Sequence, residues 1–76
     1  MTVIELIGRA SARLDEAGVS FGQGTLNAFD EAAWLVLWSL GHPLDALDDV
    51  AAHPVGAADA SRADALVDSR IRTRQP

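Results

Sequence analysis

The sequence predicts an all-α fold, namely a small helical bundle of three long helices plus a short one. Apolar residues recur at helical spacing in each long segment, and capping residues mark where these segments begin and end. No segment alternates apolar and polar residues for long enough to form a strand. Fourteen of the 76 residues are alanine, which has the highest helix propensity. Residues 1–76 are therefore expected to form one small helical domain.

The clearest element is the segment from Asn27 to Gly41, around which we expect the rest of the chain to pack. Asn27 can accept hydrogen bonds from the first turn of a helix, and Gly41 can adopt the left-handed conformation that ends one. From Ala32 to Leu40 every residue except Ser39 is apolar, so this helix is expected to be covered on all sides. These nine residues are fewer than the roughly 20 that span a bilayer, so the cover must be protein.

Trp34 and Trp38, the two tryptophans of the chain, stand four residues apart on one face of this central helix. We expect both indoles to lie in the core, where their N–H groups need hydrogen-bond partners. The alternative is that one of them lines a groove for a partner.

An amphipathic helix is expected before the central one, from Val3 to about Ala17. Thr2 and Glu5 have the spacing of a capping box, and Gly18 has the place of the terminating glycine. Its apolar side is predicted to comprise Val3, Ile4, Leu6, Ile7, Ala10 and Leu14. The following residues, Val19–Leu26, contain two glycines and are expected to form a loop that Phe21 and Leu26 attach to the core.

Two further helices are expected after the central one. His42-Pro43 breaks the chain, because proline disfavours the helical conformation of the residue before it. A short helix then follows from the spacing of Leu44, Leu47 and Val50, with Asp45 near its start, and it ends by His53-Pro54. The last helix is predicted over about Ala57–Arg74, with an apolar stripe of Ala63, Leu66, Val67 and Ile71.

Composition and charge restrict the classes of function. The formal net charge of −5 argues against a phosphate-backbone binder, so no direct nucleic acid binding is expected. The absence of cysteine fits a reducing compartment, and the first 14 residues carry Glu5, Arg9 and Arg13 where a signal peptide needs an apolar run. We therefore expect a cytoplasmic protein with no membrane segment.

The basic residues at the end of the chain have two interpretations. Arg70, Arg72 and Arg74 follow a strongly acidic stretch. They either complement the negative end of the last helix or offer a basic surface to an acidic partner. The chain reaches Pro76 just as it leaves this helix, so we expect residue 76 to be a boundary within a longer protein.

None of the polar clusters forms a recognisable active site. Asp30 and Glu31 are adjacent and point about 100° apart on a helix, so they are interpreted as partners of the helix dipole. His42 and His53 lack the spacing of metal ligands, and the aspartates of the short helix lack the glycine and glutamate of a calcium loop. Gly22-Gln23-Gly24 has neither the preceding strand nor the third glycine of a dinucleotide site. No catalytic, cofactor-binding or metal-binding residue is predicted here.

Several short motifs nevertheless run in order from Thr2 to Asp45: Thr2-Val3, Leu6-Ile7, Phe21-Gly22, Gly24-Thr25, Asn27, Asp30-Glu31-Ala32, Leu35-Val36-Leu37 and Pro43-Leu44-Asp45. In this order they resemble the N-terminal domain of bacterial protein-glutamine methyltransferases of the PrmB and HemK/PrmC group. The glycine loop makes the chain most similar to the PrmB type, which acts on large-subunit ribosomal protein three. Arg70, Arg74 and Pro76 match the exit toward the catalytic domain of this family.

The resemblance implies a division of labour between two domains. The S-adenosylmethionine-binding fold and the Asn-Pro-Pro-Tyr motif of the family would follow residue 76, so this fragment is expected to have no cofactor and no methyltransferase activity. Its partners would be its own catalytic domain and the ribosomal protein substrate. We predict the substrate-binding residues to be Phe21, Gly22, Gln23, Gly24, Thr25 and Asn27. Gln23 stands where the family has histidine. Phe21 either anchors the substrate or merely plugs the bundle.

A different class of function stays open, namely a free-standing small acidic helical adaptor or dimerisation module. An exposed Trp34 or Trp38 would favour it. A carrier protein is disfavoured, because Asp45-Ala46-Leu47-Asp48 has alanine where the serine that carries phosphopantetheine would be.

Overall fold

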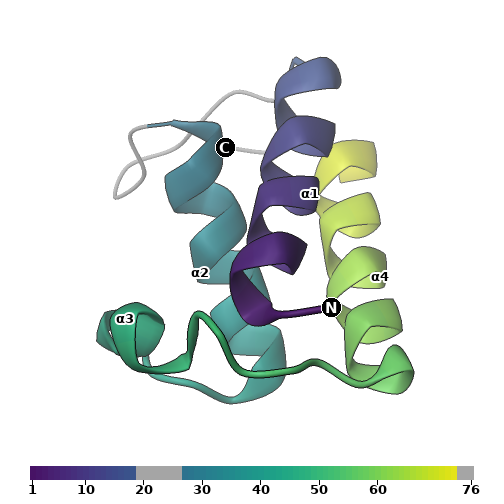
Figure 1. Cartoon of the computed structure of the whole chain (residues 1–76). Coiled ribbons are helices and arrows are strands. Elements are labelled where there is room, and N and C mark those ends of the chain that lie inside the picture. Colours follow the sequence, from purple (N-terminus) through teal and green to yellow (C-terminus); the bar gives the residue numbers. More distant parts are fainter. Residues whose placement is uncertain (19–26, 74–76) are drawn as a thin grey trace.

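The computed structural model describes residues 1–18 and 27–73 and confirms that the chain is mostly helical (Figure 1). Three long helices, α1 (Val3–Glu16), α2 (Ala28–Leu40) and α4 (Ala57–Thr73), pack side by side and each contacts the other two. Between α2 and α4 lie the 3-10 turn η1 (Leu44–Ala46) and the short helix α3 (Leu47–Val50). The described ranges contain no strand, only an isolated bridge between Thr2 and Pro54.

Helix α1 begins and ends where the sequence predicts. The Thr2 hydroxyl accepts from the Glu5 backbone at 3.3 Å, and the Glu5 carboxylate accepts from the Thr2 backbone at 2.8 Å, which completes the capping box. After Glu16, Gly18 adopts the left-handed conformation with φ of 66°. The predicted apolar side is buried except for Ile4, which is 39% exposed. Ile4 lies at the margin of the buried stripe.

The start of α1 is also tied to the segment that joins α3 to α4. The backbone N–H groups of Val3 and Ile4 donate to the carbonyls of His53 and Ala51 at 3.0 and 2.9 Å. In return the Val55 N–H donates to the Met1 carbonyl at 2.7 Å. The N–H groups that a helix leaves free in its first turn are thus satisfied by a distant part of the chain. The sequence gives no local signal for these contacts.

The capping box should make helix stability depend on pH. Hydrogen bonds from the Thr2 backbone and hydroxyl hold the pKa of Glu5 below its ordinary value of 4.5. The stabilisation from Glu5 is therefore complete above the unfolded pKa and is lost as pH falls through the lower folded pKa. Glu5→Gln keeps a capping side chain but removes the titration. Urea unfolding between about pH 5 and pH 3 should show a smaller loss of stability in the variant. Equal pH dependence in the two proteins would contradict this account.

Helix α2 confirms both predicted caps. The Asn27 Oδ1 atom accepts from the Asp30 N–H at 2.9 Å, and Gly41 has the left-handed φ of 77°. Beyond it, the His42 N–H donates to the Leu37 carbonyl at 2.9 Å, which satisfies one of the last carbonyls of the helix. Within α2, Ala32, Leu35, Val36 and Leu37 are buried.

One core joins the three long helices. Its buried apolar side chains are Val3, Leu6, Ile7, Ala10 and Leu14 of α1, Ala32, Leu35, Val36 and Leu37 of α2, Val50 of α3, and Ala63 and Val67 of α4. Leu66 and Ile71 of the predicted α4 stripe are partly buried against this core. The apolar spacing thus identified the contacting side of α4.

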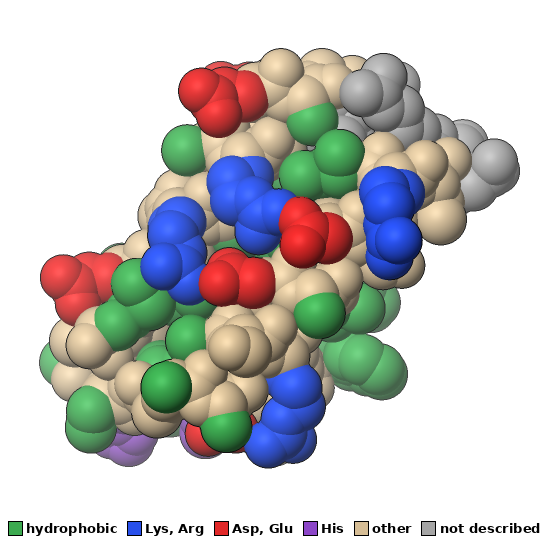
Figure 2. Space-filling view, turned by 90° about the vertical axis from the view of Figure 1, so that its right-hand side faces the viewer, with side chains coloured by type: hydrophobic (Ala, Val, Ile, Leu, Met, Phe, Trp, Pro, Cys, Tyr) green, Lys and Arg blue, Asp and Glu red, His purple; other side chains and the backbone are tan. Residues whose placement is uncertain are grey.

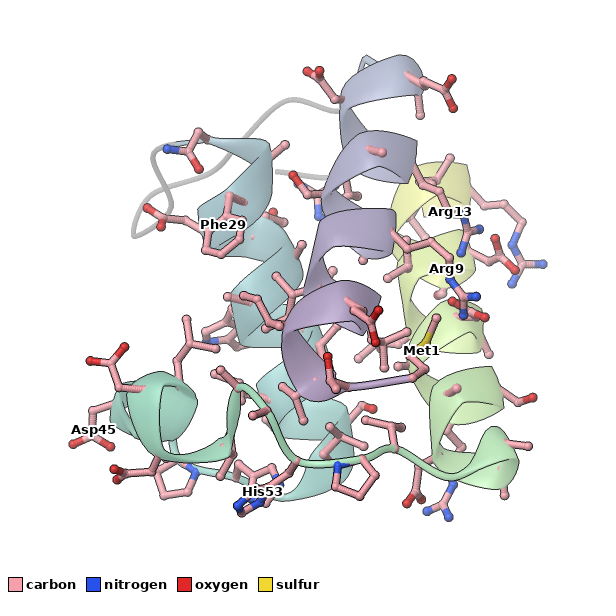
Figure 3. All side chains as sticks on the ribbon, in the orientation of Figure 1. Met1, Arg9, Arg13, Phe29, Asp45 and His53 are labelled. Atoms are coloured by element: carbon pink, nitrogen blue, oxygen red, sulfur yellow. The ribbon has the colours of Figure 1, made fainter. Side chains whose placement is uncertain are left out.

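Charged side chains join α1 to α4 at the surface. Arg9 Nη2 lies 2.6 Å from the Asp64 carboxylate, and Arg13 pairs with both Asp64 and Asp68. Figure 3 shows Arg9 and Arg13 extending from α1 toward α4, and Figure 2 shows basic and acidic side chains interleaved on this side of the molecule. Arg9 and Arg13 are four residues apart on α1, and Asp64 and Asp68 are four residues apart on α4. The two arginines, one helix turn apart, therefore face two aspartates that are also one turn apart.

Candidate functional site

Of the six predicted substrate-binding residues, the structure describes only Asn27. Phe21, Gly22, Gln23, Gly24 and Thr25 lie outside the described residues, so they stay a prediction. Asn27 is described: it is exposed and caps α2 through its Oδ1 atom. Its amide thus has a structural role at the point where α2 begins.

The helix ends fix where this predicted loop is attached. Gly18 follows the end of α1, and Asn27 precedes the start of α2. Because α1 and α2 pack side by side, both attachment points lie at the same end of the bundle (Figure 1). The first turn of α2 presents the positive end of its dipole there, with Asp30 and Glu31 in that turn.

Glu31 has a second role that the sequence did not reveal. It is 7% exposed, and its Oε1 atom accepts from the Arg70 Nε and Nη2 atoms at 3.2 and 3.1 Å. The pair joins the first turn of α2 to the last turn of α4. Arg70 and Arg72 lie in that last turn, as expected if they complement the negative end of the helix dipole. Arg70 in addition pairs with the buried carboxylate of Glu31.

The structure corrects the prediction that Trp34 and Trp38 lie in the core. Trp34 is 42% and Trp38 63% exposed, so the central helix is not covered on all sides. The two indoles stack, with ring centroids 6.5 Å apart and planes inclined by 9°. The physical reason is the arrangement of the helices: α1 and α4 cover the side of α2 that carries Ala32, Leu35 and Val36. Beyond the contact of Glu31 with Arg70 of α4, the described residues supply no helix over the two indoles.

Excess negative charge lies on η1 and α3. Asp45, Asp48 and Asp49 are exposed, and within the described ranges no salt bridge joins them to a basic side chain. By contrast, Arg9, Arg13, Arg62 and Arg70 are all engaged with carboxylates of the chain. The surface around α3 is therefore strongly acidic.

The described residues do not fit a metal ion or a nucleoside cofactor. They contain no group of three or more histidine or acidic side chains arranged around a common point. They also contain no parallel sheet, whose strand ends bind nucleoside cofactors in α/β proteins. The depression lined by Ala65, Asp68, Ile71 and Arg72 is open and lies on the outer side of α4.

None of the described helices combines the length and the apolar character needed to cross a bilayer. Fold and surface together define a small acidic all-α domain with an exposed aromatic pair on its second helix.

Known proteins similar to this chain are bacterial methyltransferases. The chain is 41% identical over 75 residues to the ribosomal protein uL3 glutamine methyltransferase of Bordetella pertussis, a match that covers 99% of this chain and 25% of that protein. The protein of the same name from Burkholderia pseudomallei is 36% identical, with 99% and 24% covered. That of Neisseria meningitidis serogroup B is 50% identical over 46 residues, with 60% and 15% covered. No family model and no solved structure matches the chain.

The resemblance to the protein-glutamine methyltransferases is thereby confirmed. This chain is homologous to part of the ribosomal protein uL3 glutamine methyltransferases, and it spans about a quarter of the length of the relatives that it matches throughout.

Proposed function

We propose that residues 1–76 are the N-terminal substrate-recognition domain of an S-adenosylmethionine-dependent methyltransferase. The parent enzyme would act in the cytoplasm on a glutamine side-chain amide of a ribosomal protein. One observation carries the proposal: the chain matches, over 99% of its length, a quarter of a protein that is named for this reaction. The cofactor and the catalytic groups would lie in the part of the parent that follows residue 76, and this fragment by itself would have no activity.

The described residues suit a binding role. The chain carries a net charge of −5. Among the described residues, Asp45, Asp48 and Asp49 on η1 and α3 are exposed and form no salt bridge. Such a surface attracts a basic partner and speeds the encounter with it. The predicted site, Phe21–Thr25 with Asn27, would offer backbone donors to an extended segment of the substrate. The predicted loop is attached to the bundle at Gly18, after α1, and at Asn27, which caps α2.

The function as a whole is tested on the intact parent protein. Purified parent, unmethylated uL3 and S-adenosylmethionine with a labelled methyl group are incubated together, and uL3 is then analysed by mass spectrometry. One added methyl group on a glutamine side chain supports the proposal. A parent that methylates other substrates but leaves uL3 unmodified would overturn it.

The predicted binding loop is tested by Phe21→Ala in the intact parent. Removing an aromatic anchor should raise the KM for uL3 by about tenfold, the effect of losing on the order of 1–2 kcal/mol of contact. The value of kcat should change little, because no catalytic group is altered. Phe29→Ala is the matched control, since Phe29 is a phenylalanine 41% exposed on α2 and outside the loop. Equal KM values for Phe21→Ala and the unmodified enzyme would reject the loop as the site.

The exposed Trp34–Trp38 pair favours a second candidate, the free-standing adaptor or dimerisation module. The native mass distinguishes the two. A species near 8.0 kDa in the source cell, or one whose mass rises with concentration to twice that value, would favour the adaptor. A species several times larger at every concentration favours the parent methyltransferase.

A further inference from the structure

The most unusual surface of the described chain is the tryptophan stripe, by which we mean Trp34 and Trp38 on α2. Both are large, exposed and stacked in nearly parallel planes 6.5 Å apart between centroids. Together they present an exposed aromatic surface that carries two indole N–H groups. Grouped exposed aromatic side chains of this kind mark places where another protein surface packs.

The stripe is held in a fixed position. Glu31 precedes Trp34 by three residues and Trp38 by seven, so all three lie on one side of α2. Arg70 binds Glu31 with two hydrogen bonds of 3.1 and 3.2 Å, and both side chains are nearly buried. Behind the stripe, Leu35, Val36 and Leu37 are buried in the core. A surface that is already ordered loses little entropy when a partner covers it.

The same ion pair indicates what the partner is. Arg70 lies in the last turn of α4, which ends at Thr73. The Glu31–Arg70 pair therefore holds the end of the last helix beside the start of the tryptophan stripe. In the parent enzyme the chain would continue from this corner of the bundle, and the relatives are about four times as long as this chain.

We propose that the tryptophan stripe packs against an apolar surface of the parent protein that follows residue 76, with hydrogen-bond acceptors there for the indole N–H groups. This inference rests on the proposed function, because it requires this chain to be the N-terminal part of a longer enzyme. It gives α2 two uses: its first turn adjoins the predicted substrate loop, and its second half orients this domain on the catalytic part.

The size of the stripe favours a contact within one chain over a contact between chains. The exposed parts of the two residues amount to about one whole tryptophan side chain, on the order of 250 Å². A stable interface between separate proteins buries about 800 Å² on each partner. A short covalent connection raises the effective concentration to the order of millimolar, so a small contact suffices when both surfaces belong to one chain.

Hydroxyl-radical footprinting of the intact parent protein, at low concentration and without substrate, tests the inference. The protection factor of each aromatic residue is its intrinsic reactivity divided by its measured oxidation rate. Phe29 is the internal control, because it is an exposed aromatic residue on the same helix and lies outside the stripe. Figure 3 shows Phe29 in front of the α2 ribbon, near the start of the helix. The protection factor of Trp38 should exceed that of Phe29 by about tenfold, since aromatic anchors of a packed interface are fully desolvated.

The variants Trp38→Ser and Phe29→Ser provide a second measurement in the same intact protein. Trp38→Ser should increase the oxidation of those residues after residue 76 that cover the stripe, because the contact is weakened, and loss of the stacked neighbour of Trp34 cannot by itself have this effect. Phe29→Ser should leave the oxidation of those residues unchanged. Equal effects of the two variants would count against a contact at the stripe.

The other outcomes overturn the inference and identify the alternative. A Trp38 no better protected than Phe29 means that the face is open in the parent. Protection that appears only as the protein forms a dimer assigns the face to a second copy, and protection that appears only after uL3 is added assigns it to substrate. Methylation of uL3 by the same sample is measured separately. A stripe protected in a parent that does not methylate uL3 would disprove the proposed function and leave the packing within the chain established.

Discussion

Leu6→Ala is expected to remove a large part of the stability of this domain. Leu6 is fully buried in the core formed by the three long helices. Truncating such a leucine costs about 2–5 kcal/mol, because transfer free energy is lost and a cavity remains. A chain of 76 residues has a total stability of about 4–11 kcal/mol. Urea unfolding followed by far-ultraviolet circular dichroism should therefore show a greatly lowered midpoint, and the variant will be partly unfolded if the total lies at the low end.

Ile4→Ala is the matched control for this prediction. Ile4 is on the same helix, two residues away, and is 39% exposed. Its truncation should cost less than about 1 kcal/mol, because most of the side chain adds little to the core. Equal losses for the two variants would mean that the core is not centred on the side of α1 that carries Leu6.

Arg70→Ala is expected to have the second large effect on stability. It would leave the Glu31 carboxylate nearly buried, since the side chains of the pair are only 13% and 9% exposed. Removing one partner of a buried ion pair costs about 3–5 kcal/mol, mainly because the remaining charge loses its compensation. The double variant Glu31→Gln with Arg70→Ala should recover part of this loss, because no buried charge remains. The measurement is again the free energy of unfolding in urea.

Arg72→Ala provides the comparison for Arg70. Both arginines lie in the last turn of α4, near the negative end of its dipole, but Arg72 is exposed. The Arg72 variant should differ from the unmodified chain by about 0.5 kcal/mol at most. Similar losses for both arginines would show that the dipole, and not the Glu31 pair, is what Arg70 stabilises.

Local chemistry explains which parts of the fold could be predicted. The bounds of α1 and α2 follow from Thr2, Glu5, Asn27 and Gly41, whose side chains or backbone freedom act within a few residues. The buried sides of α1 and α4 follow from apolar residues at helical spacing. Each of these signals lies in the segment that it organises, so a single sequence is sufficient to read them.

The exposure of Trp34 and Trp38 could not be predicted from these local signals. The rule that an all-apolar helix must be covered on all sides assumes that the cover is part of the chain. Here the described chain has helices for only one side of α2, and Trp34 and Trp38 remain exposed on the other. Spacing alone shows that the two rings share a face, but it does not show whether that face is turned to the core.

Contacts between residues that are distant in the sequence also could not be predicted. Glu31 and Arg70 are 39 residues apart, and their meeting depends on how α2 packs on α4. The hydrogen bonds from the backbone N–H groups at the start of α1 to the carbonyls of Ala51 and His53 likewise form only when the bundle is assembled. Of the candidate site, the family motif predicts Asn27 and the loop before it, and their role in binding stays a prediction, whereas physical reasoning on single residues describes only a small acidic helical domain without an active site.

The most direct test of the central claim is a binding titration of this chain with unmethylated uL3. If residues 1–76 recognise the substrate, binding should saturate, should weaken as salt screens the acidic surface, and should be reduced by Phe21→Ala but not by Phe29→Ala. Circular dichroism confirms that each variant keeps its helices. A chain that is folded and yet shows no saturable binding, at concentrations where the parent enzyme methylates uL3, would contradict the account.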